Sequence, residues 1–156
     1  MPSDLLESKL EAHQHVMSLA QQPPFPGVRS LCSYVRSIGG ANFILTHRQR
    51  GSLEALLEAH GMSGWFTDVV AGDDGFPRKP DPAGLVDLMA RRGIPRSEAL
   101  LIGDRDLDVA AASAVGIRGC FYGTNPRSEP TTYAVTDYRE LLDILIKENR
   151  ACCQQA

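Results

Sequence analysis

The segment 103–108, Gly-Asp-Arg-Asp-Leu-Asp, is the densest group of residues that could do chemistry in this sequence of 156 residues. It follows the apolar residues 99–102, which are typical of a buried strand, so the strand delivers carboxylates into the loop at its carboxyl end. Magnesium takes oxygen ligands, usually one or two carboxylates together with a substrate phosphate. We therefore predict that Asp104 is a magnesium ligand and that Asp108, one helical turn on, orients it or a bound water. Asp106 points elsewhere and is expected to cap the following helix.

A threonine at the end of another apolar run could bind phosphate. Thr46 follows residues 43–45, Phe-Ile-Leu. Its hydroxyl, with the backbone N–H groups of His47 and Arg48, could hold phosphate oxygens. A threonine that only caps a turn would look the same, so this residue needs its neighbours to decide between the two interpretations.

Lys79 stands in the segment 76–82, Phe-Pro-Arg-Lys-Pro-Asp-Pro. Prolines on both sides fix the backbone, which limits the entropy lost when the ammonium group is aimed inward. A positive charge in that position would neutralise the charge that develops in phosphoryl transfer. Most lysines are solvated, but the rigid flanks favour a functional role for this one.

The elements that must position these residues alternate along the chain. Short apolar strands are predicted at residues 42–46, 67–71, 99–103, 117–122 and near Ala134, with helices between them and after the last. Strands that alternate with helices over short connections predict an α/β fold, a parallel sheet covered by helices on both faces. Ligands of such sheets bind beyond the carboxyl ends of the strands, which brings Thr46 and Asp104 to one rim.

A proline-rich run divides the chain near its beginning. Residues 4–20 have apolar side chains at helical spacing, and the run 21–27, Gln-Gln-Pro-Pro-Phe-Pro-Gly, ends that predicted helix because proline cannot continue it. A further helix is predicted directly after the run. Three parts are therefore expected: a helix in residues 1–21, an α/β core domain in residues 22–150 and a disordered tail in residues 151–156.

The composition is that of an ordinary globular protein, with 43% hydrophobic and 22% charged residues. The net charge of −3 offers no attraction to nucleic acid or an anionic membrane. No apolar run approaches the roughly 20 residues of a membrane span, and the mixed acidic and apolar start is unlike a signal peptide. We therefore expect a cytoplasmic protein with neither nucleic acid nor membrane as a partner.

In this order and spacing, the strand that ends in Thr46, the segment 78–82 and the pair Gly103-Asp104 with Asp108 resemble the haloacid dehalogenase superfamily. The resemblance is to the branch that contains phosphoglycolate phosphatase-like enzymes, and it covers roughly residues 23–123. It implies a Rossmann-like three-layer fold and a magnesium-dependent phosphatase that acts on a small phosphorylated metabolite. The helix in residues 1–21 would be a remnant of the family's mobile helical cap.

The resemblance also implies roles for individual residues. The phosphoryl group would be bound by Thr46, His47 and Lys79. Lys79 would have a catalytic role as well, because it would steady both the phosphoryl group and the nucleophile. Asp104 and Asp108 would serve the magnesium site.

One part of the family's pattern has no counterpart in this sequence. The family's chemistry begins with an Asp-x-Asp-x-Thr stretch after its first strand, in which one aspartate attacks phosphorus and the other acts as acid and base. Asp4 is the only aspartate before residue 68, and it begins the first predicted helix. The first, central strand and most of the helical cap are therefore expected to be missing, as in a truncated reading frame, an expressed fragment, or a chain that completes its sheet otherwise.

The missing strand has consequences for the sheet, the metal and the activity. Two inner strand edges would be unpaired, which could drive self-association. Magnesium would be left with little more than Asp104 and would bind weakly if at all. The leading hypothesis is a phosphatase that is inactive in this chain, and the alternative is a phosphate-binding pseudoenzyme that keeps Thr46 and Lys79. A phosphorelay receiver domain is set aside, because its carboxylates would precede the threonine.

Overall fold

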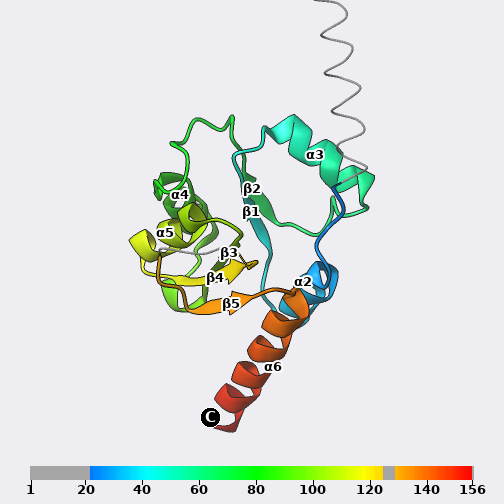
Figure 1. The fold of residues 1–156 in the computed structure, drawn as a ribbon, viewed down its shortest axis with the longest axis vertical. Helices are drawn as coiled ribbons and strands as arrows, with labels where there is room; N and C mark the ends of the chain where they lie inside the picture. Colours follow the sequence, from blue (N-terminus) through cyan, green and yellow to red (C-terminus); the bar gives the residue numbers. More distant parts are fainter. Residues whose placement is uncertain (1–21, 125–128, 156) are drawn as a thin grey trace, which may run out of the picture.

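The computed structural model describes residues 22–124 and 129–155, so the predicted helix at residues 4–20 and the cap remnant 1–21 lie outside the described residues. Helices and strands alternate along the described chain, as predicted (Figure 1). The strands are β1 (Phe43–Leu45), β2 (Asp68–Val70), β3 (Leu100–Gly103), β4 (Arg118–Tyr122) and β5 (Tyr133–Val135). The helices are α2 (Val28–Ser37), α3 (Arg50–Ala59), α4 (Ala83–Arg92), α5 (Asp106–Val115) and α6 (Tyr138–Gln154), with the short 3-10 helix η1 (Arg96–Glu98).

The strand pairs found in the described chain are all parallel, which confirms the α/β prediction. In β1 and β2, Ile44 lies opposite Val69, while in β3 and β4, Ile102 lies opposite Cys120; β4 also pairs with β5. Backbone hydrogen bonds therefore group the strands as β1–β2 and β3–β4–β5, and within residues 22–124 and 129–155 no pairing joins the two groups. Among the residues that the structure describes, the inner edges of β1 and β3 thus have no strand partner.

Helices cover both faces of the sheet, so the fold has three layers (Figure 1). On one face, Leu31 of α2 and Leu141 of α6 are buried against Cys120 and Val135. The core on the other face is formed by α4, α5 and the beginning of β3. Its buried members are Leu85, Met89, Val115 and Ala99, the residue before β3. The three-layer Rossmann-like prediction is confirmed for the described part of the chain.

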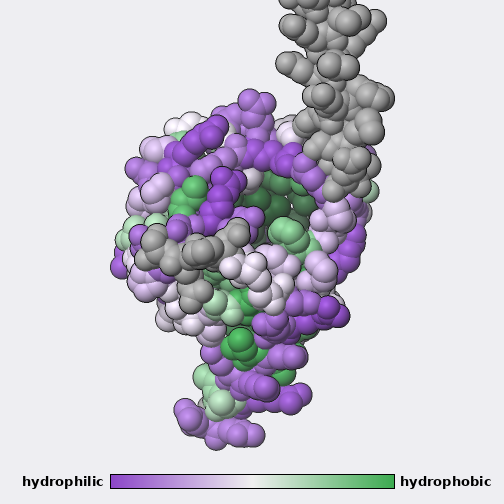
Figure 2. All heavy atoms as spheres, in the orientation of Figure 1, coloured by the Kyte–Doolittle hydropathy of each residue, from purple (hydrophilic) through white to green (hydrophobic). Residues whose placement is uncertain are grey.

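The inner strands are more exposed than a helix-covered parallel sheet normally allows. Every residue of β1 and β3 is partly exposed, whereas the three middle residues of β4 are buried. Figure 2 shows apolar side chains at the bottom of a hollow in the region of β1 and β2. The inner edge of this part of the sheet is open to solvent.

Two helix ends differ from the sequence-based expectation. α5 begins at Asp106 with Arg105 at its N-cap, so Asp106 lies in the first turn instead of capping it. α6 continues to Gln154, into the segment 151–156 that was expected to be a disordered tail; Ala, Cys, Cys and Gln at residues 151–154 include no residue that breaks a helix. α6 has 17 residues, and neither it nor any other described helix is long and apolar enough to cross a membrane.

Candidate functional site

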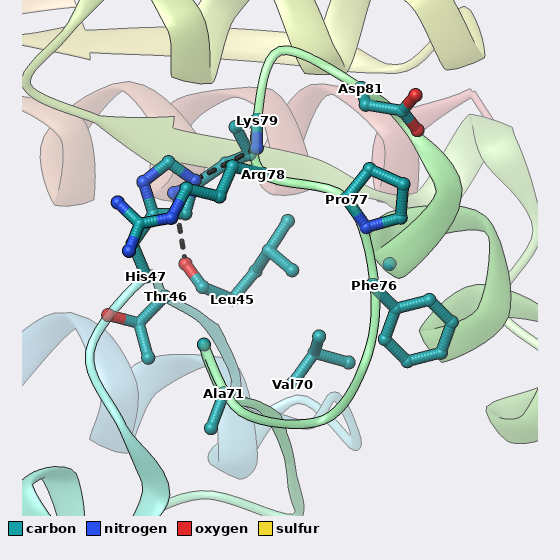
Figure 3. A pocket seen from close by; sticks show the side chains of 12 residues that line it. Leu45, Thr46, His47, Val70, Ala71, Phe76, Pro77, Arg78, Lys79 and Asp81 are labelled. Carbon is teal, nitrogen blue, oxygen red and sulfur yellow. Dashed lines mark hydrogen bonds between the residues drawn. The ribbon is translucent and has the colours of Figure 1, made fainter.

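The carboxyl ends of β1 and β2 and the loop before α4 enclose a small pocket (Figure 3). Its polar side chains come from Thr46, His47, Arg78, Lys79 and Asp81, and its apolar wall from Leu45, Val70, Ala71, Phe76, Pro77, Gly72 and Gly84. The loop after β2 lies against the backbone of His47, in the loop after β1. This is possible because Gly72 has no Cβ; one added there would overlap the carbonyl of His47. The three residues predicted to bind phosphate therefore lie together at one rim.

Thr46 continues the line of β1 and closes the turn after it. Its backbone N–H donates to the Val70 carbonyl at 2.9 Å, and its Oγ1 accepts the backbone N–H of Arg48 at 3.1 Å. The second bond uses the hydroxyl oxygen only as an acceptor, so the hydroxyl hydrogen can still be donated to an oxyanion. Thr46 therefore caps a turn, the plainer interpretation of its sequence context, and keeps the group that phosphate binding requires.

Lys79 connects the two groups of strands. Its Nζ donates to the carbonyl of Leu45, at the end of β1, at 3.1 Å, and to Oδ1 of Asp108, in the first turn of α5, at 2.6 Å. The lysine side chain is 12% exposed and the aspartate side chain 7%. An ammonium group held this firmly between two acceptors has little freedom, so its charge is preorganised at the rim.

Asp108 is the one buried charged residue of the described chain, with 5% of its surface exposed. Its Oδ1 accepts from Lys79, and its Oδ2 accepts the backbone N–H of Arg105 at 3.2 Å. The side chain packs directly on Gly103, where any Cβ would overlap it. Both carboxylate oxygens are therefore engaged by protein donors, and Asp108 fixes the lysine and the turn between β3 and α5.

Asp104 is exposed at the carboxyl end of β3, next to that turn. In the described ranges 22–124 and 129–155, no three His, Cys, Asp or Glu residues gather closely enough to hold a metal ion. With Asp108 engaged by Lys79, Asp104 is a single exposed carboxylate, which is at the lower limit of what magnesium uses beside substrate phosphate and water. This donor set would hold magnesium only weakly.

His47 supports the loop that carries Lys79. Its Nε2 accepts the backbone N–H of Lys79 at 2.9 Å, which requires an unprotonated Nε2. Burial, followed by the positive charges of Lys79, Arg78 and Arg105, lowers the pKa of His47 below its ordinary value. A neutral imidazole that accepts at Nε2 carries its proton on Nδ1, so His47 retains a donor for an anion.

Two arginines lie beside the predicted residues although the sequence pattern assigned them no role. Arg78 lines the pocket, and the charges of Arg78 and Arg105 both reach the imidazole of His47. The signal that could have identified them is their place in the chain, because each directly adjoins a predicted site residue, Lys79 or Asp104.

Asp73 and Asp74 follow β2 at the same rim but have structural partners. Asp73 accepts the backbone N–H of Arg50 at 2.8 Å, and Asp74 pairs with the Arg50 guanidinium at 2.7 Å. A backbone N–H bond from Ala71, followed by the Arg50 side chain, holds the pKa of Asp74 below its usual value against the opposing effect of burial. These two aspartates fasten the loop after β2 to the beginning of α3.

Sequence comparisons relate the chain to phosphatases. A family model described as haloacid dehalogenase-like hydrolase matches residues 2–121. The phosphoglycolate phosphatase of Pseudomonas fluorescens is 33% identical over 124 residues, which are 76% of this chain and 46% of that protein. The phosphoglycolate phosphatase of Rhodospirillum rubrum is 37% identical over 106 residues, 68% of this chain and 44% of that protein. The chain thus spans less than half the length of these curated relatives.

A solved structure supports the same fold. The crystal structure of a HAD phosphatase from Thermococcus onnurineus superposes with a TM-score of 0.71 at 24% identity, and the match covers 78% of this chain and 57% of that one. At this level of identity, the similarity concerns the fold alone.

Proposed function

Because the chain belongs to the haloacid dehalogenase-like hydrolases, we propose that it forms the phosphate-binding part of a phosphatase that hydrolyses phosphomonoesters of a small metabolite. The observation that carries this proposal is the position of Lys79, whose ammonium group lies between Leu45 and Asp108. That position places one preorganised positive charge between the carboxyl end of β1 and the first turn of α5, which is what the binding of a phosphoryl group needs. The name of the curated relatives, phosphoglycolate phosphatase, supports a small phosphorylated acid as the substrate.

Each residue of the rim has one task in this proposal. The hydroxyl of Thr46 and Nδ1–H of His47 donate to phosphoryl oxygens, and Lys79 neutralises the charge that develops on them. Asp108 holds the ammonium group in place through its 2.6 Å contact. The printed sequence offers no aspartate in the position of the family's nucleophile, so these 156 residues bind a phosphoryl group without transferring it.

Magnesium is the proposed cofactor of the complete activity, with Asp104 as its ligand in this chain. When bound, the ion would supply positive charge to the phosphoryl oxygens. Asp104 with one engaged neighbour, Asp108, should hold it weakly. We also propose a cytoplasmic location, and self-association through the unpaired edges of β1 and β3.

Two measurements test the proposal. Inorganic phosphate should bind the parent chain in a calorimetric titration, and Lys79→Met should lose that binding while Lys147→Met, at an exposed lysine of α6, should retain it. Hydrolysis of p-nitrophenyl phosphate with magnesium should be absent from the parent chain and from Asp104→Asn. Turnover by the parent that disappears in Asp104→Asn would contradict the proposed inactivity and would require a nucleophile elsewhere in the chain.

A phosphate-binding pseudoenzyme is the second candidate, favoured by the intact contacts among His47, Lys79 and Asp108. A pseudoenzyme must fold alone, so cooperative thermal unfolding of a monomer, at a temperature that rises with phosphate concentration, would favour it. If the chain associates as its concentration rises and shows no cooperative thermal unfolding, an incomplete phosphatase domain is favoured. Sedimentation velocity and calorimetry on the same sample separate the two.

A further inference from the structure

We propose that Arg48 is a positioning residue of the phosphate site, because it holds the hydroxyl group of Thr46 in place for a phosphoryl oxygen. Arg48 acts through Thr46 in this proposal and does not itself touch the ligand. The inference rests on the proposed function, in which the Thr46 hydroxyl donates to the phosphoryl group.

The backbone of Arg48 is what contacts Thr46. Its N–H donates to Oγ1 of Thr46 at 3.1 Å, and its carbonyl accepts the N–H of Gly72, in the loop after β2, at 2.8 Å. The N–H of Arg48 is thus used within the turn, although the sequence suggested that it could bind phosphate directly. Because a backbone donor orients the Thr46 side chain, the place of Oγ1 depends on where the backbone of Arg48 is held.

The side chain of Arg48 holds that backbone from two further directions. Its Nη1 donates to Oγ of Ser52, in the first turn of α3, at 3.0 Å. Its Nη2 donates to Oε1 of Gln22, the first residue that the structure describes, at 2.6 Å. A guanidinium group is planar and its nitrogens are fixed relative to one another, so two acceptors from separate parts of the chain locate it. Residue 48 therefore joins the turn after β1 to α3, to the loop after β2 and to the segment before α2.

The partners of Arg48 are neutral, so its contacts fix geometry and do not neutralise a charge. Among the described residues, no carboxylate forms an ion pair with Arg48, and Asp74, at the same rim, pairs with Arg50 instead. The competing explanation is that Arg48 attracts an anion by its charge alone. Lysine separates the two explanations, because it carries the same charge without a planar pair of donors.

A double-mutant cycle on phosphate binding tests the proposal. Inorganic phosphate would be titrated by calorimetry, at constant ionic strength, into the parent chain, Arg48→Lys and Arg48→Met, and into the same three chains with Thr46→Val. Arg36→Met is the matched control, since it removes the same charge from an exposed arginine in the last turn of α2. A thermal melt of each variant verifies that the fold is kept. NMR would measure the hydrogen exchange of the residue 48 amide, the donor to Thr46, in the parent and in the single variants.

Arg48→Met should lower phosphate affinity about fivefold, the size of one weakened hydrogen bond, and Arg48→Lys should lower it nearly as much. In the Thr46→Val background, where the hydroxyl is absent, both substitutions should change the affinity little. The residue 48 amide should exchange faster in both Arg48 variants. Arg36→Met should change neither the affinity nor the exchange.

Two results would overturn the positioning role and leave the proposed function standing. Full affinity in Arg48→Lys would mean that charge alone matters, and an equal loss with and without the Thr46 hydroxyl would mean that Arg48 acts independently of Thr46. If the parent chain binds no phosphate, the proposed function fails and the amide exchange decides the positioning role by itself. Unchanged exchange in Arg48→Met would then overturn that role, whereas faster exchange would support it.

Discussion

β1 and β4 are both paired in parallel, yet their surroundings differ. β4 has a neighbour on each side, and its residue Phe121 is 1% exposed. β1 pairs only with β2, and each of its residues is partly exposed. β4 also packs against α5, whereas β1 makes its main contacts with β2, so the burial of β4 comes from a second strand neighbour together with helix cover.

The unpaired edge of β1 also explains how Lys79 is held at the candidate site. Thr46 donates its N–H to β2, and successive residues of a strand point in opposite directions, so the polar groups of Leu45 face away from β2. The Leu45 carbonyl there accepts from the Lys79 ammonium at 3.1 Å. A side chain, in place of a neighbouring strand, satisfies this acceptor.

The largest expected effect is a difference in stability between core variants of β4 and β1. Phe121→Ala in β4 should lower the free energy of unfolding by about 4 kcal/mol, because it leaves a cavity in a closed core. Ile44→Ala in β1 should cost only about 1 to 2 kcal/mol, because its side chain is already partly exposed. Urea unfolding of both variants measures the difference. Equal costs would mean that β1 is as well buried in solution as β4.

The next effect concerns the connection between the two groups of strands. Lys79→Met should lower the free energy of unfolding by about 3 kcal/mol, because it leaves the buried carboxylate of Asp108 without its partner. The double variant Lys79→Met/Asp108→Leu should recover most of this loss, since no uncompensated charge remains, but should not recover phosphate binding. If the double variant is less stable than Lys79→Met, the pair is not the source of the loss.

Much of the fold could be predicted from sequence because its signals are local. Short apolar runs between glycines and prolines placed each strand to within about two residues. The continuation of α6 to Gln154 could not be predicted, because a polar terminal sequence permits either a helix or a frayed end.

The candidate site was predictable in its position but not in its contacts. Thr46 and Asp104 could be assigned to one rim because ligands of parallel sheets bind beyond the carboxyl ends of strands. That Asp108 would pair with Lys79, however, depends on the side chain's close packing on Gly103, a contact that no spacing rule reveals. Arg78 and Arg105 were assigned no role by the pattern, although each directly adjoins a predicted site residue.

A smaller effect sharpens the comparison at the carboxyl end of β4. Phe25, in the proline-rich run, stacks on Tyr122 at a centroid distance of 4.7 Å, and Tyr122 stacks on Tyr138 at 4.6 Å. Phe25→Ala should lower the free energy of unfolding by about 1 kcal/mol, the usual size of an aromatic pair. Phosphate affinity, which depends on the rim at β1, should stay as it is. A large loss of phosphate binding would show that the aromatic stack at β4 and the rim at β1 are coupled.

The smallest effect is a pH dependence at the β1 rim. His47 has an ordinary pKa of 6.5 when unfolded and a lower one when folded, so just below pH 6.5 the unfolded chain binds more protons. Stability should therefore fall as the pH drops below 6.5, and His47→Gln, whose amide oxygen can still accept from Lys79, should reduce that fall. Urea midpoints of parent and variant at about pH 7 and pH 5.5 measure the effect. A steeper fall in the variant would mean that the pKa is raised.

The contact between Gly103 and Asp108 links the end of β3 to the position of Lys79. Gly103 is the last residue of β3, and any side chain there would overlap the carboxylate of Asp108. That carboxylate holds the ammonium group of Lys79. A single methyl group added at Gly103 would therefore shift the Lys79 ammonium group, the proposed phosphate-binding charge, without touching a ligand. At the proposed phosphate site, ligand affinity would then depend on the absence of a side chain at Gly103, a residue that the ligand itself does not contact.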